Sequence, residues 1–128
     1  MTRCYLDTSA AAKLLVAEPE SVALARWLDQ PALRPVATLL LETELRRLAV
    51  RLGLSQQAVT GVLAGVELYA LADTAYREAG TMPRRDLRSL DALHLAGALR
   101  LDVDFLVTYD DRLAAAGAEV GITVVAPA

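Results

Sequence analysis

Four acidic residues lie at positions where a charge that merely faces water is not expected. Asp7 directly follows the apolar segment RCYL, and Asp110 directly follows FLVTY, so each lies at the end of a predicted strand. Glu44 and Asp91 each lie on the apolar stripe of a predicted helix, with leucines three or four residues away on both sides. A carboxylate buried without a partner is strongly destabilising, so acids in these positions need a compensating cation.

Each of these acids also has an ordinary structural explanation. Asp7 and Asp110 suit N-caps or turns, because Asp is favoured where a strand leads into a helix. The inward acids could pair with a buried arginine. Glu42 is spaced for an exposed ion pair with Arg46, so Glu44 is the acid that we select on this helix. No single arginine can neutralise all four acids, however, whereas a divalent cation can.

The donor set indicates a magnesium site. Mg²⁺ prefers carboxylate oxygens, waters and substrate phosphates, and with one cysteine, Cys4, and one histidine the chain lacks a cluster for a softer metal. Magnesium held by acids activates a bound water and neutralises the charge on the leaving oxygen of a phosphodiester. We therefore predict that the four acids bind Mg²⁺ and that the protein hydrolyses a nucleic-acid backbone. His94, three residues after Asp91 in an apolar stretch, we interpret as a hydrogen-bonded packing residue.

The elements that must position these acids alternate along the chain. We expect strands at residues 3–6, 34–37, 105–109 and 122–125, with a weaker candidate at 69–72. Helical patterns lie at residues 9–16, 20–29, 39–52, 55–67, 73–79, 89–100 and 111–116. The expected helix caps are Ser9, Thr38, Ser55 and Asp73, and the expected stops are Gly53 and Gly117. This alternation predicts an α/β fold whose mostly parallel sheet is covered on both faces and binds ligands beyond its carboxyl edge.

Composition suits one such domain, spanning residues 1–128. Hydrophobic residues make up 55% of the chain and aromatics only 5%, which implies a core of Leu, Ala and Val. The apolar stretches fall far short of the roughly 20 residues that cross a bilayer. Asp7 interrupts the segment where a signal peptide would be apolar, so we expect a cytoplasmic protein.

The distribution of charge qualifies the choice of partner. A net charge of −3 at first argues against a polyanion such as RNA, but without the four acids the net charge would be +1. Lys13 is the only lysine among 13 basic residues, and the guanidinium group of arginine matches phosphate oxygens in shape. Arginines gather in two groups, Arg46, Arg47 and Arg51, and Arg84, Arg85 and Arg88. The second group is our candidate for phosphate contact, although such runs are often only solvated.

Four segments resemble, in order, the successive motifs of PIN-domain ribonucleases, and in particular the VapC toxins of bacterial toxin–antitoxin pairs. These segments are YLDTSA, ETELRRLAVR, LRSLDALHLAGAL and LVTYDDRLAAA. The resemblance implies a three-layer α/β/α sandwich, a homodimer, and inhibition by a VapB-type antitoxin. It also implies RNA cleavage that depends on Mg²⁺ or Mn²⁺ and leaves a 5′-phosphate and a 3′-hydroxyl.

The resemblance assigns roles to individual residues. The acidic positions of the family fall on the acids selected above, Asp7, Glu44, Asp91 and Asp110. Its hydroxyl positions fall on Thr8, Ser9 and Thr108, where Ser9 either orients Asp7 or caps the following helix. Asp111 either shares the role of Asp110 or merely begins the last helix.

Contacts with partners follow from the same resemblance. The arginines at 84, 85 and 88 would track the RNA backbone or, alternatively, bind an acidic segment of the antitoxin. By analogy with helix-in-groove recognition, we expect the antitoxin groove between residues 20–29 and 39–67.

Other classes of function stay open. A catalytically silent PIN-like scaffold would bind a partner without cutting RNA, although it would not need all four acids. A haloacid dehalogenase-like phosphatase also has an Asp after its first strand, but it normally has a second Asp where Ser9 stands here. A response-regulator receiver domain needs a lysine near its last strand, and Lys13 is far from it.

Overall fold

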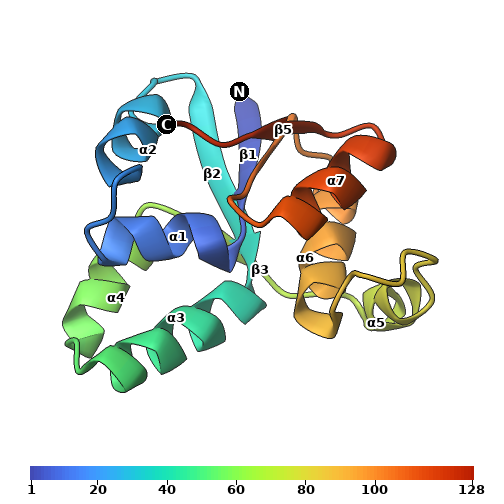
Figure 1. The fold of residues 1–128 in the computed structure, drawn as a ribbon, viewed down its shortest axis with the longest axis horizontal. Helices are drawn as coiled ribbons and strands as arrows, with labels where there is room; N and C mark the ends of the chain where they lie inside the picture. The colour runs from blue at the N-terminus through green and yellow to red at the C-terminus, as the bar shows by residue number, and fades with distance from the viewer.

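A parallel five-stranded sheet with the strand order β3-β2-β1-β4-β5 forms the centre of the computed structural model, which describes residues 1–128 (Figure 1). The strands are β1 (Thr2–Leu6), β2 (Leu33–Thr38), β3 (Glu67–Tyr69), β4 (Phe105–Val107) and β5 (Thr123–Val125). The helices are α1 (Thr8–Leu15), α2 (Ser21–Leu28), α3 (Leu39–Leu52), α4 (Gln56–Leu63), α5 (Asp73–Gly80), α6 (Ser89–Arg100) and α7 (Asp111–Glu119). No helix is both long and apolar enough to cross a membrane.

The order of the strands creates a switch point beside β1. The chain adds β2 and β3 on one side of β1 and then β4 and β5 on the other. Tyr5 at the centre of the sheet is in register with Val36 of β2 and Leu106 of β4. In open parallel sheets, ligands bind beyond the carboxyl ends of the strands at such a point. Asp7 follows β1 and Thr108 follows β4, so both lie at this edge.

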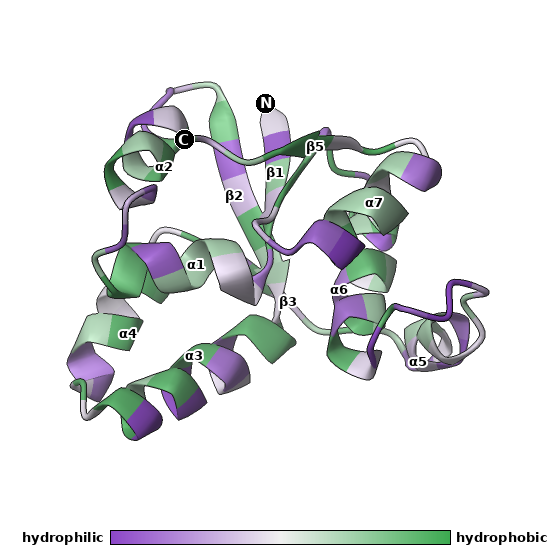
Figure 2. Ribbon diagram, viewed as in Figure 1, coloured by the Kyte–Doolittle hydropathy of each residue, from purple (hydrophilic) through white to green (hydrophobic).

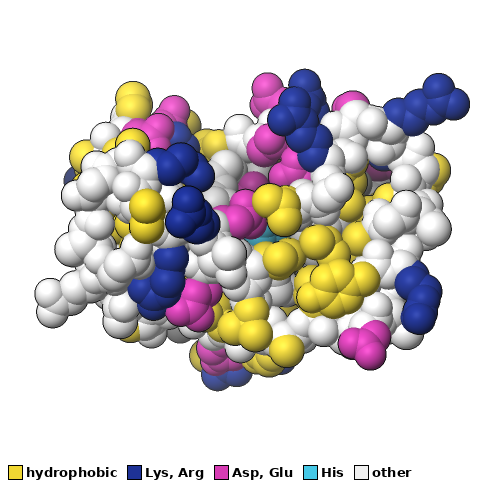
Figure 3. Space-filling model, turned by 90° about the horizontal axis from the view of Figure 1, so that it is seen from below, with side chains coloured by type: hydrophobic (Ala, Val, Ile, Leu, Met, Phe, Trp, Pro, Cys, Tyr) yellow, Lys and Arg dark blue, Asp and Glu magenta, His cyan; other side chains and the backbone are white.

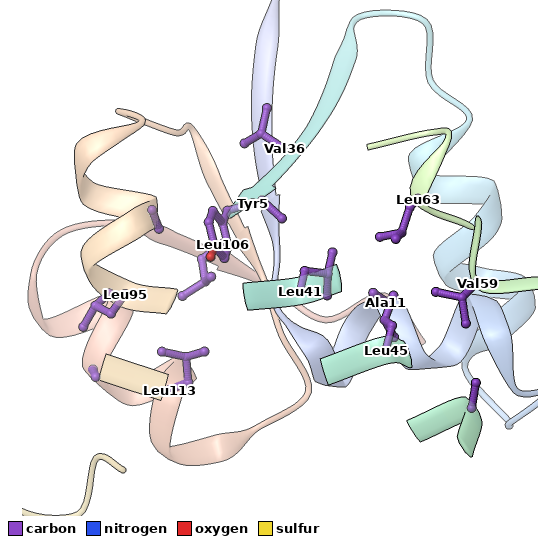
Figure 4. Packing of buried hydrophobic residues seen from close by; sticks show 14 residues of the cluster. Tyr5, Ala11, Val36, Leu41, Leu45, Val59, Leu63, Leu95, Leu106 and Leu113 are labelled. Carbon is purple, nitrogen blue, oxygen red and sulfur yellow. The ribbon is translucent and has the colours of Figure 1, made fainter. Parts of the chain in front are cut away.

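Alternating side chains of β1 build a core on each face of the sheet. Tyr5 belongs to a cluster of 14 buried residues that draws on α3, α4, α6 and α7 (Figure 4). Cys4 and Leu6 point the other way and pack with Leu24 of α2. Hydrophobic and hydrophilic residues alternate along α3, as expected for a helix that covers a core (Figure 2). The layers confirm the predicted α/β/α sandwich.

Helix α6 lies so close to the sheet that there is no room for a side chain at position 97. A Cβ atom at Gly97 would stand 2.6 Å from Cγ2 of Thr38 and 3.2 Å from the phenol oxygen of Tyr5. Glycine therefore allows β1 and β2 to approach α6, which carries Asp91 and His94.

The weak strand expected at residues 69–72 lies earlier, at Glu67–Tyr69. Its last residue pairs with Thr38, after which β2 gives way to α3 and no partner strand remains. The Arg34–Glu67 ion pair, with 3.2 Å between Nε and Oε1, links the two strands at the other end of this short pairing.

Helix boundaries also differ from expectation. The helix expected at residues 55–67 is α4, which ends at Leu63, because the chain then enters β3 at Glu67. Gly117 lies inside α7 and does not end it, because a Cβ there would stand 2.7 Å from Cδ2 of Leu106, so the glycine serves close packing. Asp73 is the first residue of α5, and Ala72 is its N-cap. Gly53 does end α3 in the left-handed conformation, with φ of 69°, as predicted.

Candidate active site

Asp7 is a buried carboxylate with several hydrogen-bond donors around it. Its Oδ1 accepts from the backbone N–H of Ala10 (2.9 Å) and its Oδ2 from Oγ1 of Thr108 (2.6 Å), while the Ser9 hydroxyl lies 2.8 and 2.9 Å from the two oxygens. Only 3% of Asp7 is exposed, and this burial raises its pKa although the hydrogen bonds oppose the shift. Asp7, rather than the predicted Ser9, caps α1, because Ser9 is already inside the helix and its hydroxyl turns back to Asp7.

The two hydroxyl groups tie the ends of β1 and β4 together. Ser9 Oγ accepts from the backbone N–H of Tyr109 at 2.9 Å. Thr108 Oγ1 accepts from the backbone N–H of Asp110 at 3.1 Å. Each hydroxyl therefore accepts a hydrogen bond from a backbone N–H and also contacts the Asp7 carboxylate. These contacts hold the carboxylate in one orientation.

A buried histidine, His94, holds Glu44 in place. Oε1 of Glu44 lies 2.6 Å from Nε2 of His94, and the other ring nitrogen, Nδ1, lies 2.7 Å from the phenol oxygen of Tyr5. A neutral imidazole satisfies both contacts when the Tyr5 hydroxyl donates to Nδ1 and the Nε2–H donates to Glu44. Burial alone would raise the pKa of Glu44, but its interactions with His94 and Thr8 outweigh burial, and the pKa is lowered.

The sequence does not predict the hydrogen bonds that link Tyr5 through His94 to Glu44. His94 was expected to pack and hydrogen bond, but its partner on another helix could not be named. The available signal is a polar ring three residues after Asp91, in the segment ALHLAGAL, which is otherwise Ala, Leu and Gly.

Asp91 and Asp110 complete the group of acids. Asp91 lies in the first turn of α6, where burial, followed by the charges of Asp110, Asp7 and, more weakly, Glu44, raises its pKa. Asp110 caps α7, its Oδ1 accepting from the backbone N–H of Leu113 at 2.9 Å. The structure thus brings all four predicted acids into one electrostatic neighbourhood, whereas Asp111 is exposed and begins α7.

No arginine or lysine neutralises these carboxylates. None of the ion pairs in the structure joins an arginine or lysine to any of the four acids. Glu42, in contrast, pairs with Arg46 at 2.8 Å as its spacing predicts. Acids that raise one another's pKa in a partly dry site are stabilised by an added cation.

The residues present fit a hard divalent ion. No three His, Cys, Asp or Glu side chains stand close enough to form a closed set of metal ligands. Mg²⁺, however, keeps several of its waters and usually takes only one or two protein carboxylates, so open spacing suits it. The carboxylate of Asp91 and Oδ2 of Asp110 accept no hydrogen bond and are open to such an ion. Both oxygens of Asp7 already accept hydrogen bonds, so they would use their remaining lone pairs, and one oxygen of Glu44 is bonded to His94.

A hollow adjoins the acids on the side of α3. It measures about 560 Å³ and its lining includes Thr8, Ser9 and Glu44. On the face seen in Figure 3, acidic side chains flank a hollow near the centre and basic side chains lie to either side. Of the arginines predicted to contact RNA, Arg84 is already paired with Asp86 at 2.8 Å and with Glu119 at 2.7 Å.

Fold and site together define a class of α/β proteins that gather carboxylates at the switch point of a parallel sheet. The family model described as PIN domain matches residues 4–119. Ribonuclease VapC46 of Mycobacterium tuberculosis strain H37Rv is 42% identical over 130 residues, which cover 99% of each chain. This chain therefore belongs to the PIN-domain family and, within it, to the VapC ribonucleases.

Solved structures share the same fold. The crystal structure of Mycobacterium tuberculosis VapC20, described as a sarcin-ricin loop cleaving toxin, has a TM-score of 0.76 at 19% identity and covers 97% of this chain and 99% of its own. A toxin–antitoxin complex from Klebsiella pneumoniae contains a chain with a TM-score of 0.71 at 19% identity, with 98% of each chain covered. At these identities the likeness concerns the fold.

Proposed function

We propose that this protein is a Mg²⁺-dependent endoribonuclease that acts as the toxin of a toxin–antitoxin pair, with Mn²⁺ as a substitute ion. The observation that carries the proposal is the group of four acids: burial, and then the charges of Asp110 and Asp7, raise the pKa of Asp91, and no arginine or lysine pairs with any of the four. The ribonuclease name of VapC46, which is 42% identical to this chain, supports RNA as the substrate, and VapC20, which shares the fold, is described as a sarcin-ricin loop cleaving toxin.

The proposed roles of the acids follow from their surroundings. Asp7 is fixed by Thr108, Ser9 and the start of α1, so it would offer an ion a carboxylate of constant orientation. Asp91 and Asp110 would face the same ion from the starts of α6 and α7. Glu44, oriented by His94, would act directly or through a coordinated water.

The proposed reaction is hydrolysis of a phosphodiester bond. A bound Mg²⁺ supplies an activated water and offsets charge on the leaving oxygen. Water adds to phosphorus as the bond to the 3′-oxygen breaks, so the products carry a 5′-phosphate and a 3′-hydroxyl. Thr108 and Ser9 would hold Asp7 in place for this step, and His94 would hold Glu44, while the charge of the bound ion would favour the ionised carboxylates that burial alone disfavours.

A VapB-type antitoxin is the proposed inhibitor. The Klebsiella pneumoniae relative in fold was solved as a toxin–antitoxin complex. A hollow of about 260 Å³ opens between α1, α2 and α4, and its apolar lining includes Leu14, Leu28 and Val62. This hollow suits an amphipathic antitoxin helix and lies within the region predicted from the sequence.

We also propose a homodimer. Apolar side chains gather beside the acids on the face seen in Figure 3. Leu39, Tyr76 and Leu90 are each about half exposed, which is more apolar surface than a monomer needs on one face. We place the protein in the cytoplasm, where its RNA substrate is made.

The test of this function is a map of new RNA ends. Antitoxin-free protein is incubated with total bacterial RNA and Mg²⁺, and the new 5′-phosphate ends are sequenced. Asp7→Asn and a chelator are the negative controls. Asp102→Asn is the matched control, because Asp102 is exposed and has a φ of 50°, a conformation that asparagine tolerates.

Discrete ends that disappear with Asp7→Asn and with the chelator, but persist with Asp102→Asn, would support the proposal. Folded protein that yields no ends would favour the alternative of a silent PIN-like scaffold. Release of phosphate from small phosphomonoesters without new RNA ends would favour a phosphatase.

A further inference from the structure

One side of α3 continues away from the acids as a row of side chains that can donate hydrogen bonds. Thr43, Arg47 and Arg51 follow one another at intervals of four residues and all line the hollow of about 560 Å³ that also contains Glu44. Four residues of helix advance by about 6 Å, which is comparable with the separation of neighbouring phosphates along a nucleic-acid strand. The row therefore begins at the acidic site and leads outward from it.

Both arginines of this row are free. Neither Arg47 nor Arg51 takes part in any ion pair or side-chain hydrogen bond in the structure, and both are exposed. Their neighbour Arg46 is different: it is bound to Glu42 at 2.8 Å, to Oε1 of Gln56 at 3.1 Å and to Thr60 at 3.2 Å. The unpaired guanidinium groups are thus available to a ligand.

The two arginines are not counter-ions of the acids. The groups that shift the pKa of Glu44 are burial, His94 and Thr8, and no arginine is among them. The pKa of Asp91 is likewise shifted by burial, the other acids and His94, without a contribution from an arginine. The charges of Arg47 and Arg51 are therefore not used within the protein and are open to an anionic ligand.

We propose that Arg47 and Arg51 bind successive backbone phosphates of the RNA and lead the strand along α3 into the site. This inference rests on the proposed ribonuclease function. It assigns the main phosphate contact to this pair, because both line the hollow that contains Glu44. In the other group, Arg84 is held by Asp86 and Glu119, and neither Arg85 nor Arg88 lines that hollow. Thr43, at the acidic end of the row, would donate to the phosphate nearest the scissile bond.

The test uses Arg47→Gln, Arg51→Gln and the double variant, with Arg77→Gln as the matched control. Arg77 lies on α5, is exposed and unpaired, and loses the same charge when changed. Binding of a labelled, mixed-sequence single-stranded RNA is measured by anisotropy as a function of salt, in an Asp7→Asn background that prevents cleavage. Cleavage of total RNA is measured separately in the otherwise unaltered chain, and thermal melting checks that each variant folds.

We expect each α3 variant to weaken RNA binding by about 3- to 10-fold, and to reduce the slope of log affinity against log salt by about 0.7 per lost contact. In cleavage, KM should rise while kcat at saturating RNA stays unchanged. Arg→Lys at either position should restore part of the affinity, because it keeps the charge but not the planar fork.

Equal RNA binding by the α3 variants and Arg77→Gln would overturn the inference while leaving the ribonuclease function standing if the unaltered chain still cleaves. Weaker binding of an acidic peptide with unchanged RNA binding would assign the row to a protein partner and also overturn it. A folded protein that neither binds nor cleaves RNA would refute the proposed function together with this inference.

Discussion

His94 Nε2 lies 2.6 Å from Oε1 of Glu44, so a fully buried imidazole on α6 holds a partly exposed carboxylate on α3. Behind the ring, Tyr5 contacts Nδ1 at 2.7 Å and Thr38 at 3.3 Å, which carries the chain of hydrogen bonds into the sheet. The orientation of an acid at the site thus depends on residues that never face solvent.

Removing the histidine should impair cleavage without removing any acid. His94→Leu leaves Glu44 unoriented, and we expect the cleavage rate to fall by about 10- to 100-fold, as for other partners of metal-binding side chains. His94→Gln, whose amide can reach the place of Nε2, should recover part of the rate, and Tyr5→Phe should have a smaller effect than His94→Leu. Single-turnover cleavage below the melting temperature of every variant measures this. Full activity of His94→Leu would mean that the orientation of Glu44 does not matter.

Thr108 should set the affinity for the metal through Asp7. Thr108→Val keeps the shape but removes the donor at 2.6 Å from Oδ2 of Asp7. We expect the Mg²⁺ concentration for half-maximal cleavage to rise about 10-fold. Thr123→Val, an exposed position in β5, is the control and should leave this concentration unchanged. An unaltered Mg²⁺ requirement in Thr108→Val would argue that Asp7 needs no hydroxyl to orient it.

The repulsion among the acids should be measurable as a loss of stability. The pKa of folded Asp91 is raised by burial and by Asp110 and Asp7, so its ionised form destabilises the metal-free fold at neutral pH. This penalty disappears as the pH falls through the raised pKa. Asp91→Asn should therefore raise the metal-free melting temperature at neutral pH by about 2 °C, with a smaller gain in mild acid.

Added Mg²⁺ should offset the difference in melting temperature between Asp91→Asn and the unaltered chain. Mg²⁺ should raise the melting temperature of the unaltered chain more than that of Asp91→Asn, because binding to the native state stabilises it by mass action. Asp102→Asn should behave like the unaltered chain under both conditions. A lower metal-free melting temperature for Asp91→Asn would show that the carboxylate is not under strain from its neighbours.

Gly97 should be intolerant of even a methyl group. Gly97→Ala places a Cβ 2.6 Å from Thr38 and should cost about 1–3 kcal/mol of unfolding free energy, displacing Tyr5 as well. Gly61→Ala in α4 meets nothing within 4 Å and should be neutral or stabilise by about 0.5 kcal/mol. Urea unfolding measures both, and equal stabilities for the two variants would contradict the packing described for α6.

Much of the architecture follows from local patterns in the sequence. Apolar segments ending in Asp7 and Asp110 predicted strands at the correct edge of a parallel sheet, and the structure confirms the α/β class. The spacing of Glu42 and Arg46 predicted their ion pair, because side chains four residues apart share a helix face. Such features depend only on residues within one or two turns of each other.

Tertiary structure decided what depends on distant segments. Gly117 lies inside α7 and not at its end, because Leu106 packs against it. Ser9 does not cap α1; its hydroxyl contacts Asp7 and accepts from the backbone N–H of Tyr109, which is 100 residues away in the sequence. The contact of His94 with Glu44 spans 50 residues, and it forms only because the folded chain brings one residue of α6 next to one residue of α3. Local periodicity determines on which face of its own helix a side chain lies. The fold determines which other elements lie opposite that face, and therefore which side chains find a hydrogen-bond partner and which charges stay unpaired.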